Sequence, residues 1–373
     1  MSEISIHYRN KVNHSLYKHL LKPVLFQHDP EYVHDKMTEF GEFLGNSTLG
    51  QKLTKTFFDY ENSALRQKIF GIHFSNPIGL SAGFDKDAKL TGILPHIGFG
   101  FAEAGSITGS GCAGNPKPRL WRLPHSQSLS VYYGLKNDGS KAIAKRLSRK
   151  HFAIPIGMNI AMTNCNDNLN IKNAVMDYAQ AFRTLEPIGN YLTINISCPN
   201  TTGGQPFIND YNLDYLLDIL DEIPSKKPIF LKLSPDLDEE GIDKILEVAK
   251  AHRVSGIICT NLTKKRFNFS NLEKKIPIRG GLSGKPLSKL SDKMISYIYK
   301  KEGKRFILIG SGGIFNAEDA YRKIRLGASL LQLITGMIYE GPQVISEINQ
   351  GLVKLLKRDG FANISEAVGI DNR

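Results

Sequence analysis

From residue 77 onward, the chain repeats one pattern eight times: a short apolar run, then polar or glycine residues, then a helix-like stretch. The helix-like stretches include Asn173–Leu185, Glu239–His252, Leu287–Lys301, Ala317–Leu326 and Val344–Lys357. The apolar runs are Pro77–Gly83, Phe99–Ser106, Ile154–Ile160, Tyr191–Cys198, Pro228–Leu233, Gly256–Asn261, Phe306–Gly312 and Ser329–Thr335. Alternating strands and helices predict a parallel sheet covered by helices. Eight units in about 280 residues match an α/β TIM (β/α)8 barrel, whereas a doubly wound open sheet, the alternative, rarely needs eight.

The first 60 residues predict an N-terminal helical hairpin extension ahead of the barrel. Asp29 and Pro30 supply an N-cap and a first-turn proline for its second helix. We therefore divide the chain into a hairpin of residues 1–60 and a barrel of residues 61–373. The hairpin either packs on the barrel or docks on a bilayer surface and admits a lipid-soluble molecule. Within residues 14–45, the apolar positions at helical spacing are Leu16, Leu20, Leu21, Val24 and Leu25, then Val33, Met37, Phe40 and Leu44.

Residues 107–139 interrupt the alternation between the second and third predicted strands. They hold Pro116, Pro118 and Pro124 among several short apolar pieces. We expect a partly β insertion over the mouth of the barrel, not a separate domain.

The composition excludes several other classes of protein. The net charge is +12, but Lys and Arg are spread along the chain. This distribution predicts no nucleic-acid partner and favours attraction to an anionic membrane surface. The cysteines Cys112, Cys165, Cys198 and Cys259 form no CxxC pair and no zinc-like spacing, so we expect no metal site and a reducing compartment. No apolar run of about 18 residues is present, so no spanning helix is expected.

Polar residues gather where the predicted strands end, which is where a TIM barrel carries its active site. Any one of them has a structural explanation, such as an Asn that caps a turn. Buried strand ends rarely collect so many amides and two lysines without a ligand, so the set predicts a binding site. Its members are Ser81, Ala82, Gly83, Lys86, Asn159, Asn195, Ser197, Cys198, Lys232, Thr260 and Asn261.

Glycine-rich turns follow the last two predicted strands. The seventh strand ends in Gly310-Ser311-Gly312-Gly313 and the eighth in Thr335-Gly336. Turns of this kind bring backbone N–H groups close to a phosphate, and this fold usually binds phosphate there. A phosphorylated cofactor such as FMN fits, while the GxGxxG pattern of a nicotinamide site is absent from the first strand-turn. Lys232 would then face the flavin, where a fixed cation stabilises the reduced form.

Cys198 is the candidate catalytic base. It stands at a strand end before Pro199, and the adjacent glycines Gly203 and Gly204 favour a loop that closes as a lid. The thiol would take a proton while hydride passes to the flavin. Because a free thiol has a pKa of about 8.5, we expect Cys198 to be activated or to act in concert.

Longer runs resemble the class 2 dihydroorotate dehydrogenases, which are quinone-linked and membrane-associated. They are FSNPIGLSAGFDKD, GNPKPRLWRLP, INISCPNT, LKLSPDL, GGLSGKPL, GASLLQLITG and the C-terminal DGFANISEAVGIDNR. The resemblance implies a flavoprotein oxidoreductase of pyrimidine biosynthesis that acts on a CH–CH bond. Dihydroorotate would give a hydride to FMN and a proton to a base, and quinone would reoxidise the flavin through a tunnel under the hairpin. It also implies a peripheral protein at the cytoplasmic face of a membrane.

The resemblance assigns roles motif by motif. Cys198 is the base, and His34 and Arg122 match quinone-tunnel residues. Substrate contacts are carried over to Lys86, Asn195, Asn200 and Asn261. Contacts to FMN are carried over to Ala82, Gly83, Lys86, Ser106, Asn159, Asn195, Lys232, Thr260, Gly284, Gly313 and Thr335.

Several residues depart from the family pattern. Cys198 stands where class 2 enzymes carry Ser, and the loop Thr201–Gln205 lacks the class 2 Leu-Arg. The other departures are Val131 for a substrate-binding Asn, Leu135 for Phe, Ala161-Met162 for Gly-Lys, Leu262 for Thr and Ile334 for a tunnel Tyr. A buried polar group left unpaired costs about 1–3 kcal/mol, so apolar replacements suit a less polar substrate.

Two hypotheses therefore stay open. The first is a quinone-linked, FMN-dependent dihydroorotate dehydrogenase with unusual pocket residues. The second is a divergent paralogue that applies the same flavin chemistry to a different, less polar small molecule, in specialised metabolism. A third, a binding protein without activity, predicts loss of the phosphate site, but Gly310, Gly312 and Gly313 are present.

Overall fold

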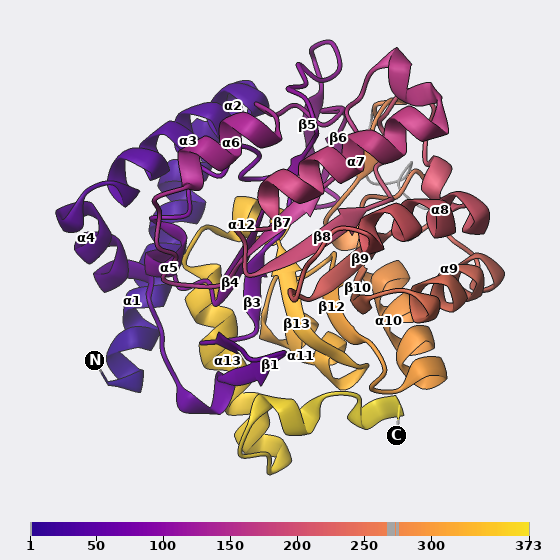
Figure 1. Cartoon of the computed structure of the whole chain (residues 1–373). Helices are drawn as coiled ribbons and strands as arrows, with labels where there is room; N and C mark the ends of the chain where they lie inside the picture. Colours follow the sequence, from indigo (N-terminus) through magenta and orange to yellow (C-terminus); the bar gives the residue numbers. More distant parts are fainter. Residues whose placement is uncertain (1, 267–272, 274–275, 373) are drawn as a thin grey trace.

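Eight parallel strands close into a barrel in the computed structural model, which describes residues 2–266, 273 and 276–372 (Figure 1). Their order around the ring is β10-β12-β13-β3-β4-β7-β8-β9, and β9 pairs with β10. Each predicted apolar run overlaps one strand, which confirms the TIM barrel. The strands are β3 (Ile78–Leu80), β4 (Phe101–Ile107), β7 (Ile156–Ile160), β8 (Tyr191–Asn195), β9 (Ile229–Leu233), β10 (Val254–Cys259), β12 (Ile307–Ser311) and β13 (Ala328–Leu333).

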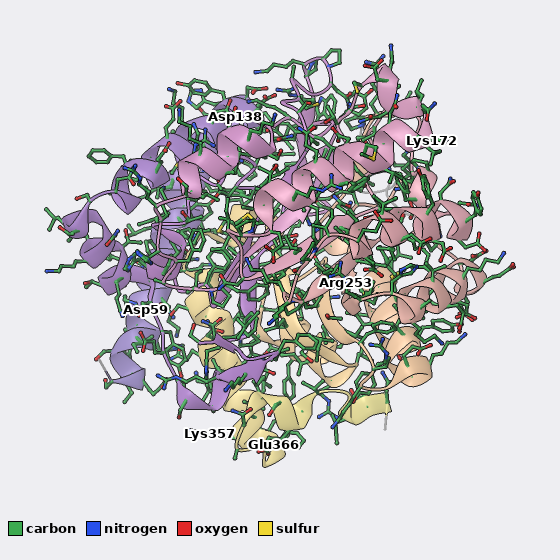
Figure 2. All side chains as sticks on the ribbon, viewed as in Figure 1. Asp59, Asp138, Lys172, Arg253, Lys357 and Glu366 are labelled. Atoms are coloured by element: carbon green, nitrogen blue, oxygen red, sulfur yellow. The ribbon has the colours of Figure 1, made fainter. Side chains whose placement is uncertain are left out.

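Helices cover the outside of the barrel, and side chains fill the space between the two layers (Figure 2). Apolar positions at helical spacing cause this packing: in α7, for example, Val175, Tyr178 and Phe182 are buried. The five predicted helices agree with the structure to within two residues at each end. The helices are α5 (Leu94–Ile97), α6 (Ser140–Leu147), α7 (Ile171–Leu185), α8 (Asp210–Asp221), α9 (Glu239–Ala251), α10 (Ser288–Glu302), α11 (Ala317–Arg325), α12 (Thr335–Glu340) and α13 (Val344–Asp359).

The inside of the barrel changes from apolar to polar along the strands. The apolar layer includes Phe74 of β2 (Ile72–Phe74), which pairs with β1 (Gln67–Ile69). Its other buried members are Phe101, Tyr191, Phe230, Ile258, Ile309 and Leu330. Because side chains two residues apart share a face of a strand, the next inward positions are polar. They are Glu103, Thr193, Lys232, Thr260, Ser311 and Gln332, toward the C-terminal ends of the strands.

The N-terminal segment is more helical than predicted. Its elements are α1 (Glu3–Leu16), a π-helical turn (Tyr17–Leu21), α2 (Lys22–Gln27), α3 (Pro30–Gly45) and α4 (Thr48–Phe58). The predicted first helix began too late because the start of α1 docks through polar contacts: Asn10 is buried and its Nδ2 donates to Oγ of Ser346 in α13. The hydrophobic pattern also missed α4, whose Leu49, Leu53 and Phe57 face outward. No helix of the described chain has the length and apolarity to cross a bilayer.

The insertion between β4 and β7 is partly β, as predicted. It carries β5 (Leu120–Leu123) and β6 (Ser128–Val131), which join β11 (Gly281–Leu282) in a three-stranded antiparallel sheet. Leu120, Leu129 and Val131 of this sheet line a cavity at the mouth of the barrel. The insertion therefore forms one wall of the site.

Candidate active site

Two cavities adjoin at the C-terminal ends of the barrel strands. The glycine-side cavity lies against the turns after β12 and β13, and Gly312, Gly313 and Gly336 are among its lining residues. The mouth cavity extends from the strand ends to the insertion and to His34 of α3. The residues that line both are Ala82, Lys232, Asn261, Leu262, Ser283, Ile334 and Thr335. One continuous site is thus built from segments far apart in the sequence.

Most of the residues predicted for the site line these cavities. Ala82, Lys232, Asn261 and Thr335 line both. The glycine-side cavity adds Thr260, Gly284 and Gly313. The mouth cavity adds His34, Gly83, Lys86, Ser106, Asn195, Cys198 and Asn200.

Asn159, Ser197 and Arg122 are among the predicted residues that line neither cavity. Asn159 is fully buried beneath the site, where its side chain bonds to Glu103 and Ser106. Arg122 lies at the N-terminal helices: its Nη1 donates to the carbonyl of His28 over 2.8 Å, and its guanidinium carbon is 4.5 Å from the centre of the Phe26 ring. Arg122 therefore anchors the segment between α2 and α3.

The glycine-side cavity is lined by buried polar groups. Gln332 is fully buried, and neither its amide nitrogen nor its oxygen forms a hydrogen bond of good geometry among the described residues, although the hydroxyl of Tyr191 is close enough to interact with it. Nζ of Lys232 donates to Oγ of Ser81 over 3.1 Å. Burial lowers the pKa of Lys232, and the charge of Glu103 opposes that shift. A buried orphan amide beside a buried cation fits a polar ligand that carries negative charge.

The turn after β12 requires glycine for steric reasons. Gly313 has a φ of 72°, and a Cβ built there would lie 2.5 Å from Cβ of Ser288. A larger residue would be strained and would clash. Bare backbone is thereby kept at the cavity wall, next to Thr335 and Gly336 at the start of α12.

Cys198 lines the mouth cavity beside Asn195 and Asn200. Burial raises the pKa of its thiol to about 11, against the opposing effects of the Asn200 backbone N–H and of Lys264. The thiol is therefore protonated near neutral pH in the ligand-free protein. This differs from the activated thiolate that is one of the two expectations for a catalytic base. All four cysteines are unpaired.

Lys86 is one of the lysines that line the mouth cavity. Its Nζ lies 4.0 Å from the centre of the Tyr133 ring. Burial lowers the pKa of Lys86 to about 8, and the charge of Lys136 adds to the shift. Sequence reasoning did not single out Lys136, which lines the same cavity and has no hydrogen bond or ion pair within the described part of the chain. Other lining residues that it missed include Leu120, Leu129, Ser283 and Ile338.

Most departures from the family pattern lie at the mouth cavity. Val131, Leu135, Leu262 and Ile334 line it. Met162 does not: it is buried in the hydrophobic core, at 5% exposure. The carbonyl of Val131 accepts a hydrogen bond from Nδ2 of Asn200 over 2.8 Å, while its apolar side chain forms part of the wall.

Comparisons with known proteins agree with this geometry. The family model described as "Dihydroorotate dehydrogenase" matches residues 64–356. Proteins named "Dihydroorotate dehydrogenase (quinone)" are similar: that of Trichodesmium erythraeum is 37% identical over 96% of this chain and 100% of its own length, and that of Nostoc punctiforme is 39% identical over 95% and 98%. The crystal structure of dihydroorotate dehydrogenase from Eimeria tenella in complex with ferulenol has a TM-score of 0.82 and 30% identity, covering 92% of this chain and 96% of that one. This chain belongs to the dihydroorotate dehydrogenase family.

Proposed function

We propose that this protein is an FMN-dependent dehydrogenase that oxidises dihydroorotate to orotate and passes the electrons to a quinone. The observation that carries the proposal is the mixed lining of the mouth cavity. It contains Lys86, Asn195, Asn200 and Asn261 together with Cys198, as a polar anionic substrate requires. It also contains Leu120, Leu129, Ile334 and Ile338, and Phe26 of the N-terminal helices packs against the cluster of Leu120 and Leu129, which suits a lipid-soluble oxidant.

The residues of the glycine-side cavity fit FMN. The glycine turns would hold the phosphate, and Gln332 and Lys232 would meet polar edges of the ring. When bound, FMN supplies an acceptor for hydride and a donor of electrons to quinone. The cation of Lys232 favours negative charge at that position, which supports flavin reduction.

The residues that line the mouth cavity would orient the substrate and take up its proton. Lys86 offers a charge and Asn195, Asn200 and Asn261 offer amides, so an anionic planar ligand would be fixed in one orientation. Sγ of Cys198 would accept the substrate proton as hydride leaves, after the thiol has released its own proton to water, a loss that burial disfavours.

The N-terminal helices support peripheral association with a membrane. Lys11 and Lys18 are exposed on the same segment and would attract anionic lipid. Most of the large apolar side chains that the described chain exposes lie there: Ile4, Tyr8, Val12, Leu16, Leu20, Leu21, Val24, Tyr32, Met37, Phe40, Phe43, Leu49, Leu53 and Phe57. The apolar contacts of Phe26 with Leu120, Leu129 and Ile338 connect this surface to the mouth cavity.

A second candidate is flavin-dependent dehydrogenation of a less polar small molecule. It is favoured by Val131, Leu135 and Leu262, which all line the mouth cavity where the family pattern is more polar or aromatic. Such a substrate would carry an alkyl group where dihydroorotate carries a polar one.

Anaerobic mixing of the FMN-loaded protein with dihydroorotate tests the proposal. Rapid loss of the oxidised-flavin absorbance, with recovery on addition of a quinone, is the expected result. A flavin that dithionite reduces but dihydroorotate does not would overturn dihydroorotate as the substrate and favour the second candidate.

A further inference from the structure

A buried carboxylate lies beneath the site and takes no part in the chemistry described so far. Glu103 of β4 is fully buried and lines neither cavity. Its Oε1 accepts from the hydroxyl of Thr193 over 2.6 Å, and its Oε2 accepts from Nδ2 of Asn159 over 3.0 Å. A group that uses both oxygens as acceptors dictates which atom each neighbour must turn toward it.

The carboxylate fixes the amide of Asn159. A reversed amide would set Oδ1 against Oε2 of Glu103, two acceptors without a proton between them. With Nδ2 held by Glu103, Oδ1 of Asn159 faces Ser106 and accepts its hydroxyl proton over 2.5 Å. The orientation of Asn159 therefore makes the Ser106 hydroxyl the donor of the hydrogen bond between them. Ser106 in turn lines the mouth cavity.

The hydroxyl of Ser106 in turn favours one orientation of the Asn195 amide. It has a single proton, which is donated to Asn159, so its Oγ accepts from Nδ2 of Asn195 over 2.8 Å. Oδ1 of Asn195 then faces Nδ2 of Asn261, 3.2 Å away. Oδ1 of Asn261 is in turn held by the backbone N–H of Leu262 over 2.9 Å.

We propose that Glu103 is a positioning residue that, through Asn159 and Ser106 and together with the backbone N–H of Ser197, sets which atoms of Asn195 and Asn261 face the bound ligand. The chain of bonds reaches both cavities because Asn195 lines one and Asn261 lines both. Glu103 also supports the charge of Lys232, so only the part of its effect on a ligand that depends on Asn195 reports on this chain of hydrogen bonds. The inference rests on the proposed function for the identity of that ligand. The arrangement of donors and acceptors along the chain of hydrogen bonds does not depend on it.

The test is a double-mutant cycle read as the dissociation constant of orotate on the oxidised, FMN-loaded protein, followed by flavin absorbance. Glu103→Gln keeps the shape of the side chain but replaces one acceptor oxygen by an amide donor. Both orientations of the Asn159 amide then become possible. The dissociation constant should rise about tenfold, as expected for a misdirected buried hydrogen bond. In the Asn195→Ala background, the same change should alter it by less than about threefold.

Thr193→Val is the matched control. It removes the other donor to Glu103 and leaves the bonds from Asn159 to Asn195 intact, so orotate binding should stay within about threefold of wild type even if the melting temperature falls. An equal effect of Glu103→Gln with and without Asn195, or no effect at all, overturns the proposal.

Failure of the proposed function is recognised separately. If orotate leaves the wild-type flavin spectrum unchanged, dihydroorotate is not the substrate. The same cycle is then read on the dissociation constant of FMN, because Ser106 and Asn195 line the cavity for any ligand. Additive effects on FMN binding overturn the positioning role, and non-additive effects support it.

Discussion

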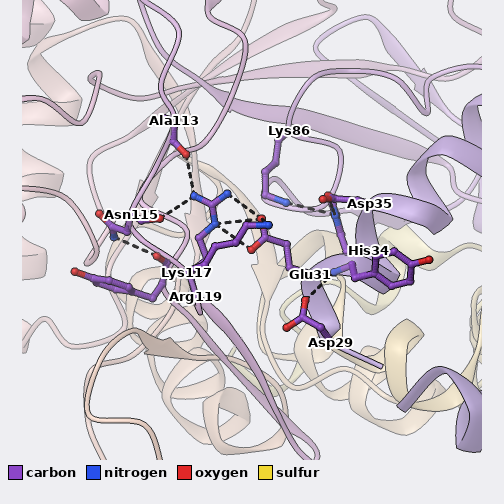
Figure 3. A network of polar contacts seen from close by, with 11 residues as sticks. Asp29, Glu31, His34, Asp35, Lys86, Ala113, Asn115, Lys117 and Arg119 are labelled. Atoms are coloured by element: carbon purple, nitrogen blue, oxygen red, sulfur yellow. Dashed lines mark hydrogen bonds and ion pairs between the residues drawn. The ribbon is translucent and has the colours of Figure 1, made fainter. Parts of the chain in front are cut away.

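The ammonium nitrogen of Lys86 lies 3.4 Å from Nε2 of His34 (Figure 3). This contact joins α3 of the N-terminal segment to the loop after the first barrel strand. Nε2 of His34 is also 2.9 Å from the carbonyl of Phe84, and burial together with the charge of Lys86 lowers the pKa of His34. Because these two basic side chains are in contact in a buried environment, the neutral form of His34 is favoured beside a charged Lys86.

Orotate binding should weaken as the pH rises through about 8, because burial and Lys136 lower the pKa of Lys86 to about 8. An anion binds best to the protonated lysine, so affinity should be flat well below that pKa and should fall, by at most about tenfold per pH unit, above it. The measurement is an orotate titration of the flavin absorbance at a series of pH values. Other groups that act on the Lys86 charge are Glu31, Asp35 and Asp87.

The Lys136→Met variant checks the cause of this pH dependence. Removing the neighbouring cation should raise the pKa of Lys86 and move the loss of affinity to higher pH. An affinity that is flat across pH 8 in the wild type, or a midpoint unmoved in the variant, would show that Lys86 does not control binding.

Replacement of Cys198 by Ala should slow flavin reduction by dihydroorotate by about 10²–10⁴-fold, the usual contribution of a positioned base, while FMN stays bound. Because burial raises the pKa of the thiol to about 11, the wild-type rate should still be rising with pH at about pH 9. Stopped-flow reduction under anaerobic conditions measures both. Cys198→Ser keeps a proton acceptor and serves as the control; an unchanged rate in Cys198→Ala would remove this residue as the base.

The barrel could be predicted from sequence because each unit repeats a local signal. Strand runs such as Ile229–Leu233 are wholly buried and contain no turn residue, and glycine or polar residues end them. The N-terminal segment was harder because α1 docks through Asn10 and because α4 turns its apolar residues outward. A search for a buried apolar stripe at helical spacing therefore detects neither the start of α1 nor α4.

The site was predicted where function requires a residue type at a strand end. Lys232, Asn195 and Cys198 follow that rule. Lys136 and Ser283 do not follow it. Lys136 belongs to the insertion and Ser283 to the segment after β11, and long-range packing places both segments against the cavity. Asn159 stands at a strand end as predicted, and its side chain is hydrogen-bonded to Glu103 and Ser106 beneath the cavities.

Glu31→Gln should destabilise the protein by about 3 kcal/mol, because it leaves the buried Arg119 without its counter-charge. Oε1 of Glu31 lies 2.8 Å from Nη2 of Arg119, and both side chains are nearly inaccessible (Figure 3). Burial alone would raise the pKa of Glu31, but Arg119 and Lys117 hold it below its ordinary value. The stabilisation is thus present at neutral pH and lost in acid, as the pH falls through the lowered pKa.

Thermal denaturation measures this effect, as a decrease of about 4 °C in melting temperature at neutral pH. Lys117→Met is the control, since that lysine is 66% exposed and its ion pair with Glu31 should contribute little. Equal losses in the two variants would contradict the assignment of the stabilisation to Arg119.

Leu20→Glu should weaken binding to vesicles of mixed phosphatidylcholine and phosphatidylglycerol by about tenfold, since it removes an apolar side chain and adds a negative charge. Leu20 is 61% exposed on the π-helical turn. Cosedimentation measures binding, and reduction of a soluble dye should be unchanged. Leu169→Glu, at a site of 54% exposure between β7 and α7, should leave binding intact. Equal losses in both variants would exclude a membrane role specific to the N-terminal helices.

Val131→Asn should lower the KM for dihydroorotate by about fivefold or more, because the added amide can pair with a polar group of a substrate that now meets an apolar wall. Val131 lines the mouth cavity with Cys198, and its carbonyl is already held by Asn200, so the new side chain would be directed by a fixed backbone. Steady-state kinetics with a soluble electron acceptor measure the change, and Val131→Leu is the apolar control. Turnover that appears only in Val131→Asn would identify the native substrate as the less polar one. A KM that rises or stays the same would place Val131 away from the substrate.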